Sequence, residues 1–301
     1  MTDKHVRIYE VGPRDGLQNE KEPISTDAKL RFLSLLADAG LHEIEATSFV
    51  SSKAIPQLAD ADEVMSRLER RPGVRYPVLV PNARGLERAE AASADAVAVF
   101  TAASEPFTKA NINMTIAESI DAFRPVVTRA RERGWWTRGY VSTAFGCPYQ
   151  GEVGEAAVVG VAQQLLELGV EELSIGDTIG VAGPADVRRV VKALFAAGIG
   201  AERLAMHFHD TRGTALANVS AALELGIRCF DASTGGTGGC PYAPGAAGNL
   251  ATEDLVYLLE REGLTHGVDL DALLVAARHV SETLGRPLTT KVGQAGGWRV
   301  P

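Results

Sequence analysis

Residues 137–178, TRGYVSTAFGCPYQGEVGEAAVVGVAQQLLELGVEELSIGDT, contain the pattern on which the fold prediction rests. Two short apolar runs, at 137–143 and 172–178, are typical of buried strands. The stretch between them, 153–168, has the apolar spacing of an amphipathic helix, and Gly169 stands where a helix C-cap is expected. These residues therefore predict a strand–helix–strand unit, the connection that parallel strands require.

The same unit recurs from end to end of the chain. Further buried strands are predicted at 6–12, 43–49, 74–80, 96–102, 204–210 and 228–234. The other helices are predicted from Ser25 or Thr26 to Gly40 and at 57–70, 84–92, 115–133, 184–197, 213–225, 250–262 and 269–284. Repetition of about eight strand–helix units favours a closed parallel (β/α)8 or TIM barrel, here with an additional C-terminal helix.

A doubly wound open sheet is the alternative architecture. No G-x-G-x-x-G motif follows the first predicted strand, where a dinucleotide-binding fold carries it. No Pro- or Ser-rich linker interrupts the pattern either, so a single barrel domain over residues 1–301 is predicted.

Composition excludes several classes of function. The chain has 301 residues, 46% hydrophobic and 23% charged, and 30 Lys and Arg against 38 Asp and Glu leave a net charge of −8. Neither a nucleic-acid partner nor a membrane is therefore expected, and no apolar run approaches the roughly 18 residues of a membrane helix. The first residues run almost directly into a strand, which predicts no signal or transit peptide. Three cysteines fit a reducing compartment, so we expect a soluble cytoplasmic protein.

The rarest side chains gather at predicted strand ends, where barrel enzymes build their sites. His207 and His209 stand two residues apart in a strand, so both imidazoles project to one face and can reach one cation. Taken alone, an H-x-H motif is a weak signal, and two histidines without a function are as good an interpretation as a metal site. Asp15, after the first strand, would complete a two-histidine, one-carboxylate site that suits Mg, Mn, Co or Zn.

Charged residues near other strand ends leave alternatives open. Arg14 beside Asp15 is either a surface ion pair or a guanidinium that clamps a carboxylate or an enolate oxygen, and its position favours the second. Glu45 and Asp177 are carboxylates in apolar strands. Each therefore needs a cationic or metal partner, or has a raised pKa suited to base chemistry. The alternative for either carboxylate is a structural arginine or a backbone N–H as partner, and for Glu45 the structural and the functional interpretation are equally favoured.

The stretch GGTGGCPYAPGAAGN, residues 235–249, is rich in glycine. It is either a phosphate-cradling loop or a mobile lid, and the lid is favoured because the stretch has no Lys or Arg. Cys240 is its reactive side chain, a candidate proton donor or nucleophile. The tetrapeptide GCPY also occurs at 146–149, but Cys240 is favoured over Cys147 because its loop can move. Cys229, inside a strand, is predicted to be a core residue.

Seven segments along nearly the whole chain resemble one family, in the same order. They are VGPRDGLQNE, IEATSFVS, RGYVS, GDTIG, HFHDT, GGCPYAPGAAGNLATEDLVY and KVGQA. Together they resemble the hydroxymethylglutaryl-CoA lyases, a family of metallolyase barrels, and the cysteine-loop segment is specific to that branch. The related isopropylmalate and homocitrate synthases resemble only the RDG turn and the H-x-H motif.

The resemblance implies a lyase that cleaves 3-hydroxy-3-methylglutaryl-CoA, an acyl-CoA thioester, to acetoacetate and acetyl-CoA in leucine degradation. It implies a divalent cation, Mg or Mn with Co or Zn as alternatives, held by Asp15, His207, His209 and Asn249. It implies that Arg14 stabilises the enolate oxygen, Asp177 is the general base, Glu45 supports metal and substrate, and Cys240 is the catalytic thiol. It implies substrate contacts by Arg14, Gln18, Ser48, Arg138 and Thr178, and a homo-oligomer, dimeric or larger.

Other functions and two departures from the family pattern stay in view. The alternatives are a lyase for another 3-hydroxyacyl-CoA, a Claisen-type acyl-CoA condensing synthase, and a catalytically silent barrel. Arg212 stands where an aromatic residue is expected, which could alter the mouth of the site. The C-terminus lacks the extra cysteine of the animal members, so thiol regulation between subunits is not expected.

Overall fold

The computed structural model describes residues 4–239, 248–288 and 290–298. Within these ranges nine strands form one sheet, in the order β2-β1-β9-β8-β7-β6-β5-β4-β3, and every neighbouring pair is parallel. The strands are β1 (Arg7–Glu10), β2 (Glu43–Ile44), β3 (Thr47–Ser48), β4 (Val78–Leu79), β5 (Ala96–Ala102), β6 (Trp136–Ser142), β7 (Glu172–Asp177), β8 (Leu204–Phe208) and β9 (Cys229–Ala232).

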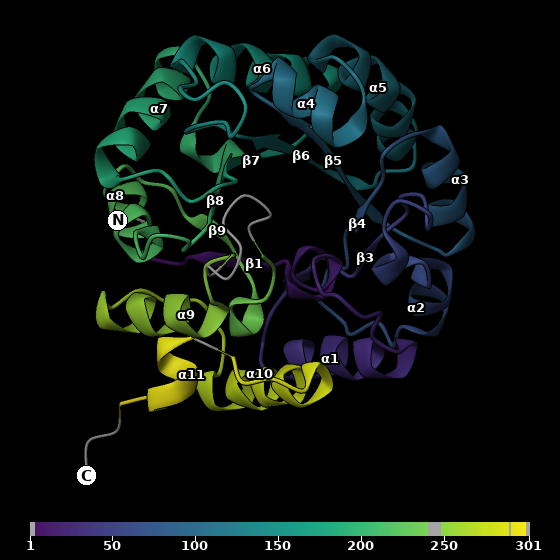
Figure 1. Cartoon of the computed structure of the whole chain (residues 1–301), viewed down its shortest axis with the longest axis vertical. Helices are drawn as coiled ribbons and strands as arrows, with labels where there is room; N and C mark the ends of the chain where they lie inside the picture. Colours follow the sequence, from purple (N-terminus) through teal and green to yellow (C-terminus); the bar gives the residue numbers. More distant parts are fainter. Residues whose placement is uncertain (1–3, 240–247, 289, 299–301) are drawn as a thin grey trace.

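The two ends of this order belong to one short stretch of chain, so the sheet closes into a ring (Figure 1). Only Glu45 and Ala46 separate β2 from β3. The N–H of Glu45 donates to Glu10 O on one side (2.8 Å), and the N–H of Ala46 donates to Pro77 O on the other (2.9 Å). The stretch therefore bonds both neighbours, as one strand of an eight-stranded barrel does, and the predicted TIM barrel is confirmed.

Helices surround the ring (Figure 1). Those that follow the barrel strands are α1 (Thr26–Asp38), α2 (Ala61–Arg67), α3 (Ala83–Ala91), α5 (Ile116–Glu132), α6 (Glu155–Leu168), α7 (Pro184–Ala196), α8 (Ala215–Glu224) and α9 (Thr252–Arg261). The predicted additional C-terminal helix is α10 (Leu270–Leu284), which packs against α1 and α9. No helix in the described ranges is both long and apolar enough to cross a bilayer.

Three details differ from the prediction. The strand predicted at 74–80 shortens to β4, because Pro77 has no N–H to continue the ladder. The helix predicted from residue 57 begins at Ala61, after the 3-10 turn η2 (Pro56–Leu58). Two short helices were not predicted: α4 (Glu105–Ile112), which is capped by the Ser104 hydroxyl, and α11 (Lys291–Ala295).

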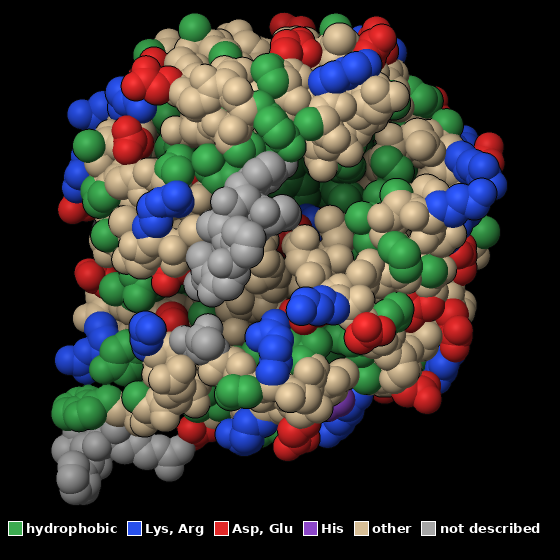
Figure 2. All heavy atoms as spheres, viewed as in Figure 1, with side chains coloured by type: hydrophobic (Ala, Val, Ile, Leu, Met, Phe, Trp, Pro, Cys, Tyr) green, Lys and Arg blue, Asp and Glu red, His purple; other side chains and the backbone are tan. Residues whose placement is uncertain are grey.

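Apolar side chains on the two faces of the barrel wall belong to different hydrophobic clusters. Ile8 belongs to the large hydrophobic core between strands and helices. Its neighbour Tyr9 belongs to a separate small cluster with Val11, Ala205 and Cys229, because successive strand residues point to opposite faces. Cys229 is 2% exposed, so its prediction as a core residue is confirmed. The ring is hollowed at its centre, with hydrophobic side chains around part of the rim (Figure 2).

Candidate active site and metal centre

The turn after β1 positions Arg14 and Asp15. Residues Gly12–Gly16 form one π-helical turn, η1, in which the N–H groups of Asp15 (2.7 Å) and Gly16 (3.2 Å) both donate to Val11 O. A Cβ at Gly16 would lie 2.3 Å from Thr237 Oγ1. Glycine at this position therefore lets the turn lie directly against the segment that follows β9.

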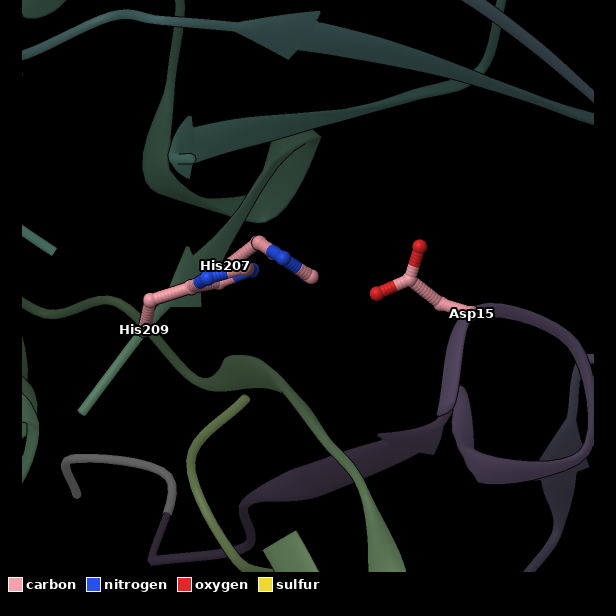
Figure 3. A group of neighbouring side chains, drawn as sticks. All are labelled: Asp15, His207 and His209. Carbon is pink, nitrogen blue, oxygen red and sulfur yellow. The ribbon is translucent and has the colours of Figure 1, made fainter. Parts of the chain in front are cut away.

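Asp15 faces the two histidines at the end of β8 (Figure 3). Asp15, His207 and His209 each offer one ligand atom, and these atoms lie within 4.8 Å of one another. Burial raises the pKa of Asp15, but Arg14, both histidines and Asn249 outweigh it and lower that pKa to about 2. Burial and His207 lower the pKa of His209 to about 3. At pH 7 Asp15 is therefore an anion and His209 a neutral imidazole, the forms that bind a cation.

Asn249, the last residue of the glycine-rich stretch, also belongs to this group. Its Nδ2 donates to Asp15 Oδ2 (2.8 Å) and to Thr237 O (3.1 Å). Among the residues that the structure describes, its buried Oδ1 has no hydrogen-bond partner, and neither has the buried Nδ1 of His209. Buried polar atoms are normally satisfied, and two unpartnered ones beside a carboxylate fit a bound cation. The structure thus brings all four predicted ligands together.

Arg14 lies between two carboxylates. Its Nη1 is 2.6 Å from Asp15 Oδ1 and its Nε is 2.7 Å from Glu45 Oε2. Glu45 Oε2 also accepts a hydrogen bond from Tyr140 Oη (2.9 Å), while the buried Glu45 Oε1 has no partner in the described part of the chain. Burial raises the pKa of Glu45, although Arg14 and Tyr140 oppose that rise. The alternative of an arginine partner for Glu45 is thus realised, and this arginine is itself a predicted site residue.

Asp177 ends β7 with both carboxylate oxygens bonded to the backbone. Oδ1 accepts from the N–H of Val181 (2.9 Å) and Oδ2 from the N–H of Ala182 (3.0 Å). Burial raises the pKa of Asp177 against these hydrogen bonds and against the nearby His207 and Arg212. A carboxylate with a raised pKa has the character of a general base.

The predicted substrate contacts fall in different surroundings. Gln18 is half-buried directly beyond η1. Ser48 is buried, with its Oγ donating to Leu79 O (3.3 Å), and Thr178 Oγ1 accepts from the N–H of Thr143 (2.8 Å). Arg138 is fully buried inside the barrel with Asp231 and Glu172, and its Nη1 has no hydrogen-bond partner within residues 4–239, 248–288 and 290–298. Contact of these four with substrate stays a prediction.

Cys240 and most of the predicted lid, residues 240–247, lie outside the described residues. The other GCPY copy is described. Cys147 is buried, with its Sγ 2.9 Å from Ser104 Oγ. Arg212, the departure noted in the sequence, donates from Nη1 to the carbonyls of Ile179 and Gly180 (2.9 Å each). It therefore ties the loop after β8 to the loop after β7.

Comparison with known proteins agrees with this geometry. A family model described as HMGL-like matches residues 5–280. The chain belongs to the HMGL-like family. The resemblance seen in the sequence segments is thereby confirmed.

Individual HMGL-like relatives are similar over almost the whole chain. The mitochondrial hydroxymethylglutaryl-CoA lyase of Pongo abelii is 49% identical over 292 residues, covering 97% of this chain and 90% of the relative. The crystal structure of the Bacillus subtilis HMG-CoA lyase has a TM-score of 0.96 at 48% identity, covering 98% of both chains. An HMG-CoA lyase from Acinetobacter baumannii, solved with coenzyme A and 3-methylmalate, has a TM-score of 0.93 at 40% identity, covering 99% of this chain and 98% of that one.

Sequence reasoning missed three polar residues of this HMGL-like site. Tyr140 bonds Glu45, Asp231 contacts His207, and Glu10 accepts from the N–H of Gly12 (2.8 Å) at the start of η1. Two signals could have found them. Tyr140 stands two residues after Arg138 in the same strand, hence on the same face, and Asp231 and Glu10 are carboxylates in apolar strands, the argument applied to Glu45 and Asp177.

Proposed function

We propose that this chain is a divalent-metal-dependent carbon–carbon lyase that cleaves 3-hydroxy-3-methylglutaryl-CoA to acetoacetate and acetyl-CoA. Support comes from relatives of near-complete coverage that carry this name. The observation that carries the proposal in this chain is the cluster of Asp15, His207 and His209 beside the buried Arg14 guanidinium. It combines a candidate cation site with a fixed positive charge, and an enolate-forming cleavage requires both.

Asp15, His207 and His209 would hold the cation, with Asn249 Oδ1 as the fourth ligand. Oxygen and imidazole donors without a thiolate suit Mg or Mn, with Co or Zn as alternatives. When bound, the cation supplies positive charge that lowers the pKa of a hydroxyl beside it.

The side chains around this site carry out the proton transfers and stabilise the enolate. Asp177 takes the proton of the C3 hydroxyl as the C2–C3 bond breaks, so that C3 becomes the ketone carbon of acetoacetate. The electron pair of that bond passes to C2 and forms the enolate of acetyl-CoA. Arg14, oriented by Glu45, stabilises the enolate oxygen, and the Cys240 thiol returns a proton to C2.

Several finer features belong to the same proposal. Arg138 Nη1, which is buried and has no hydrogen-bond partner among the described residues, is available to a substrate oxygen. Gln18, Ser48 and Thr178 contribute further contacts. The stretch 235–249 acts as a lid over an acyl-CoA substrate. We also propose a homo-oligomer in the cytoplasm with a role in leucine degradation, which rests on the sequence and the resemblance alone.

The test is turnover of 3-hydroxy-3-methylglutaryl-CoA by EDTA-stripped protein, with and without added Mg²⁺ or Mn²⁺, followed through acetoacetate. Metal-dependent cleavage that is lost in the folded His207→Ala variant is expected. Faster cleavage of another 3-hydroxyacyl-CoA would transfer the assignment to that substrate. Release of free CoA from acetyl-CoA and a 2-oxo acid would instead identify a synthase. No metal-dependent turnover of any of these by folded, metal-loaded protein would refute the proposal.

A further inference from the structure

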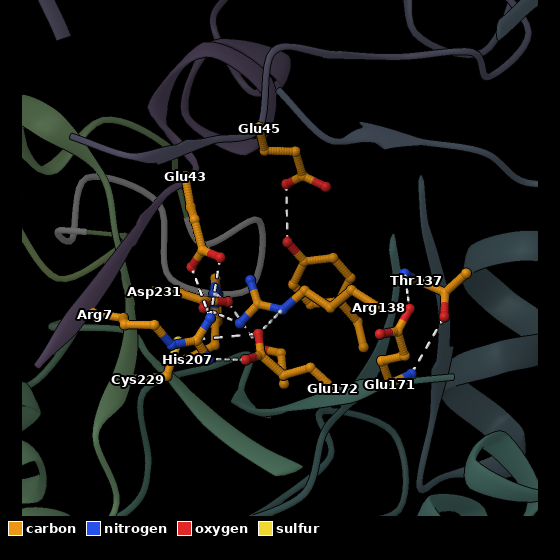
Figure 4. Close-up of polar contacts among 12 residues, drawn as sticks. Arg7, Glu43, Glu45, Thr137, Arg138, Glu171, Glu172, His207, Cys229 and Asp231 are labelled. Atoms are coloured by element: carbon orange, nitrogen blue, oxygen red, sulfur yellow. Dashed lines mark hydrogen bonds and ion pairs between the residues drawn. The ribbon is translucent and has the colours of Figure 1, made fainter. Parts of the chain in front are cut away.

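A buried carboxylate outside the proposed ligand set contacts one of the ligands. Asp231 Oδ2 lies 3.2 Å from Nδ1 of His207 (Figure 4). The two residues are directly paired in the register of β8 and β9, so their side chains lie side by side on one face of the wall. With Nδ1 occupied by Asp231, Nε2 is the nitrogen of His207 left for a cation.

Asp231 is held in place by both of its oxygens. Oδ2 also accepts a hydrogen bond from Ser174 Oγ (2.7 Å), and Oδ1 accepts one from Arg138 Nη2 (2.5 Å). The side chain of Asp231 is fully buried. Rotation of Asp231 toward the cation site would break these bonds, so it acts on the cation only through His207.

Arg138 is in turn fixed on the side away from Asp231. Its guanidinium carbon lies 3.7 Å from the centre of the Tyr9 ring, and its Nε lies 3.2 Å from Glu172 Oε1. Arg138 and Glu172 are directly paired in the register of β6 and β7. Glu172 forms an ion pair with Arg7, which also pairs with Glu43. Charged groups of alternating sign thus continue from His207 through the barrel to β1 and β2 (Figure 4).

We propose that Asp231 is a positioning residue for the metal ligand His207, and that Arg138 holds Asp231 in this role. The carboxylate keeps the imidazole proton on Nδ1 and fixes the plane of the ring, so that the Nε2 lone pair points to the cation. Outer partners of this kind typically contribute about 10–100-fold to metal affinity. The inference rests on the proposed metal site.

The first test is Mn²⁺ binding to Asp231→Asn, measured by electron paramagnetic resonance titration of free Mn²⁺. The carboxamide has the shape of the carboxylate but no charge, and we expect Mn²⁺ affinity to fall about 10–100-fold. The matched control is Glu43→Gln, which removes a carboxylate that pairs with Arg7 and Arg75 at the other end of the same network. Its Mn²⁺ affinity is expected to equal that of the parent. Equal affinity of folded Asp231→Asn and the parent would overturn the proposal.

The second test reads the parent protein itself, with a variant used only to assign the signal, and it decides the matter even where Asp231→Asn does not fold. Histidine ¹⁵N–¹H correlation spectra of the metal-free parent report the tautomer of each of the six histidines, and His207→Gln assigns the signal. We expect the proton of His207 on Nδ1, and a proton on Nε2 would overturn the proposal. Failure of the parent to bind Mn²⁺ overturns both the metal site and this inference. Mn²⁺ binding without lyase turnover overturns the proposed function alone.

Discussion

Replacing Asp15 by Asn removes one charge at nearly constant volume. The Asp15 side chain is 18% exposed and lies 2.6 Å from Arg14 Nη1. Burial raises its pKa, but Arg14, the two histidines and Asn249 lower it from 3.8 to about 2. At about 1.4 kcal/mol per pH unit, that difference corresponds to about 2 kcal/mol. Because the folded-state pKa is the lower one, this stability is present above pH 3.8 and is lost as the pH falls through about 2.

The same substitution removes a proposed ligand. A ligand at 100 times its Kd stabilises the folded state by about 2.7 kcal/mol, so Mn²⁺ at that concentration raises the unfolding free energy of the parent by that amount. Asp15→Asn is expected to gain much less from Mn²⁺. The unfolding free energy of the variant is therefore expected to be lower than that of the parent by about 2 kcal/mol without metal. With metal the difference is expected to be larger.

Urea unfolding of EDTA-treated protein at pH 7, repeated with Mn²⁺, measures both differences. The control is Asp60→Asn. Asp60 is 21% exposed and lies 2.6 Å from Lys29 Nζ, away from the predicted ligands. It is expected to lower stability without changing the gain from Mn²⁺. An Asp15→Asn variant as stable as the parent without metal, or with an undiminished gain from Mn²⁺, would refute the reasoning.

Three further predictions concern neighbouring residues. Burial and His207 lower the pKa of His209 to about 3, so its contribution to stability is present above pH 6.5 and declines below it. The metal-free parent is expected to lose about 2 kcal/mol between pH 7 and pH 5, and an equal loss in His209→Gln by urea unfolding would contradict this. Arg14→Lys is expected to lower kcat about 10²–10³-fold, because an ammonium cannot keep the contacts to Glu45 and Asp15 and also reach an enolate. Steady-state kinetics, with Mn²⁺ titration in parallel, measure this effect, and an unchanged kcat would exclude Arg14 as the group that stabilises the enolate. Cys240→Ser is expected to lower kcat about 10²–10⁴-fold with Mn²⁺ affinity unchanged, and a parallel loss of Mn²⁺ binding would instead identify a ligand.

The local pattern of apolar residues in the sequence was sufficient to predict the barrel and the rim at which its candidate site lies. Alternation of short apolar runs with amphipathic stretches predicted each strand position, because a parallel strand is covered on both faces and reads as a continuous apolar run, whereas a helix buried on one face has a period of 3.6. The predicted helix C-cap at Gly169 has a left-handed φ of 103°, which only glycine adopts readily. Asp15 and His207 could be assigned to one site because all parallel strands of a barrel end at the same rim.

The pairing of charged groups was decided only by the tertiary structure. The sequence left Glu45 between a structural arginine and a catalytic role, and the fold gives it Arg14. Arg138 was predicted from the resemblance to contact substrate, and the structure places Asp231 and Glu172 around it. Periodicity determines which face of a strand a side chain occupies. Which other side chain lies beside it on that face depends on the register between strands that are far apart in sequence. That register is set only when the closed ring packs.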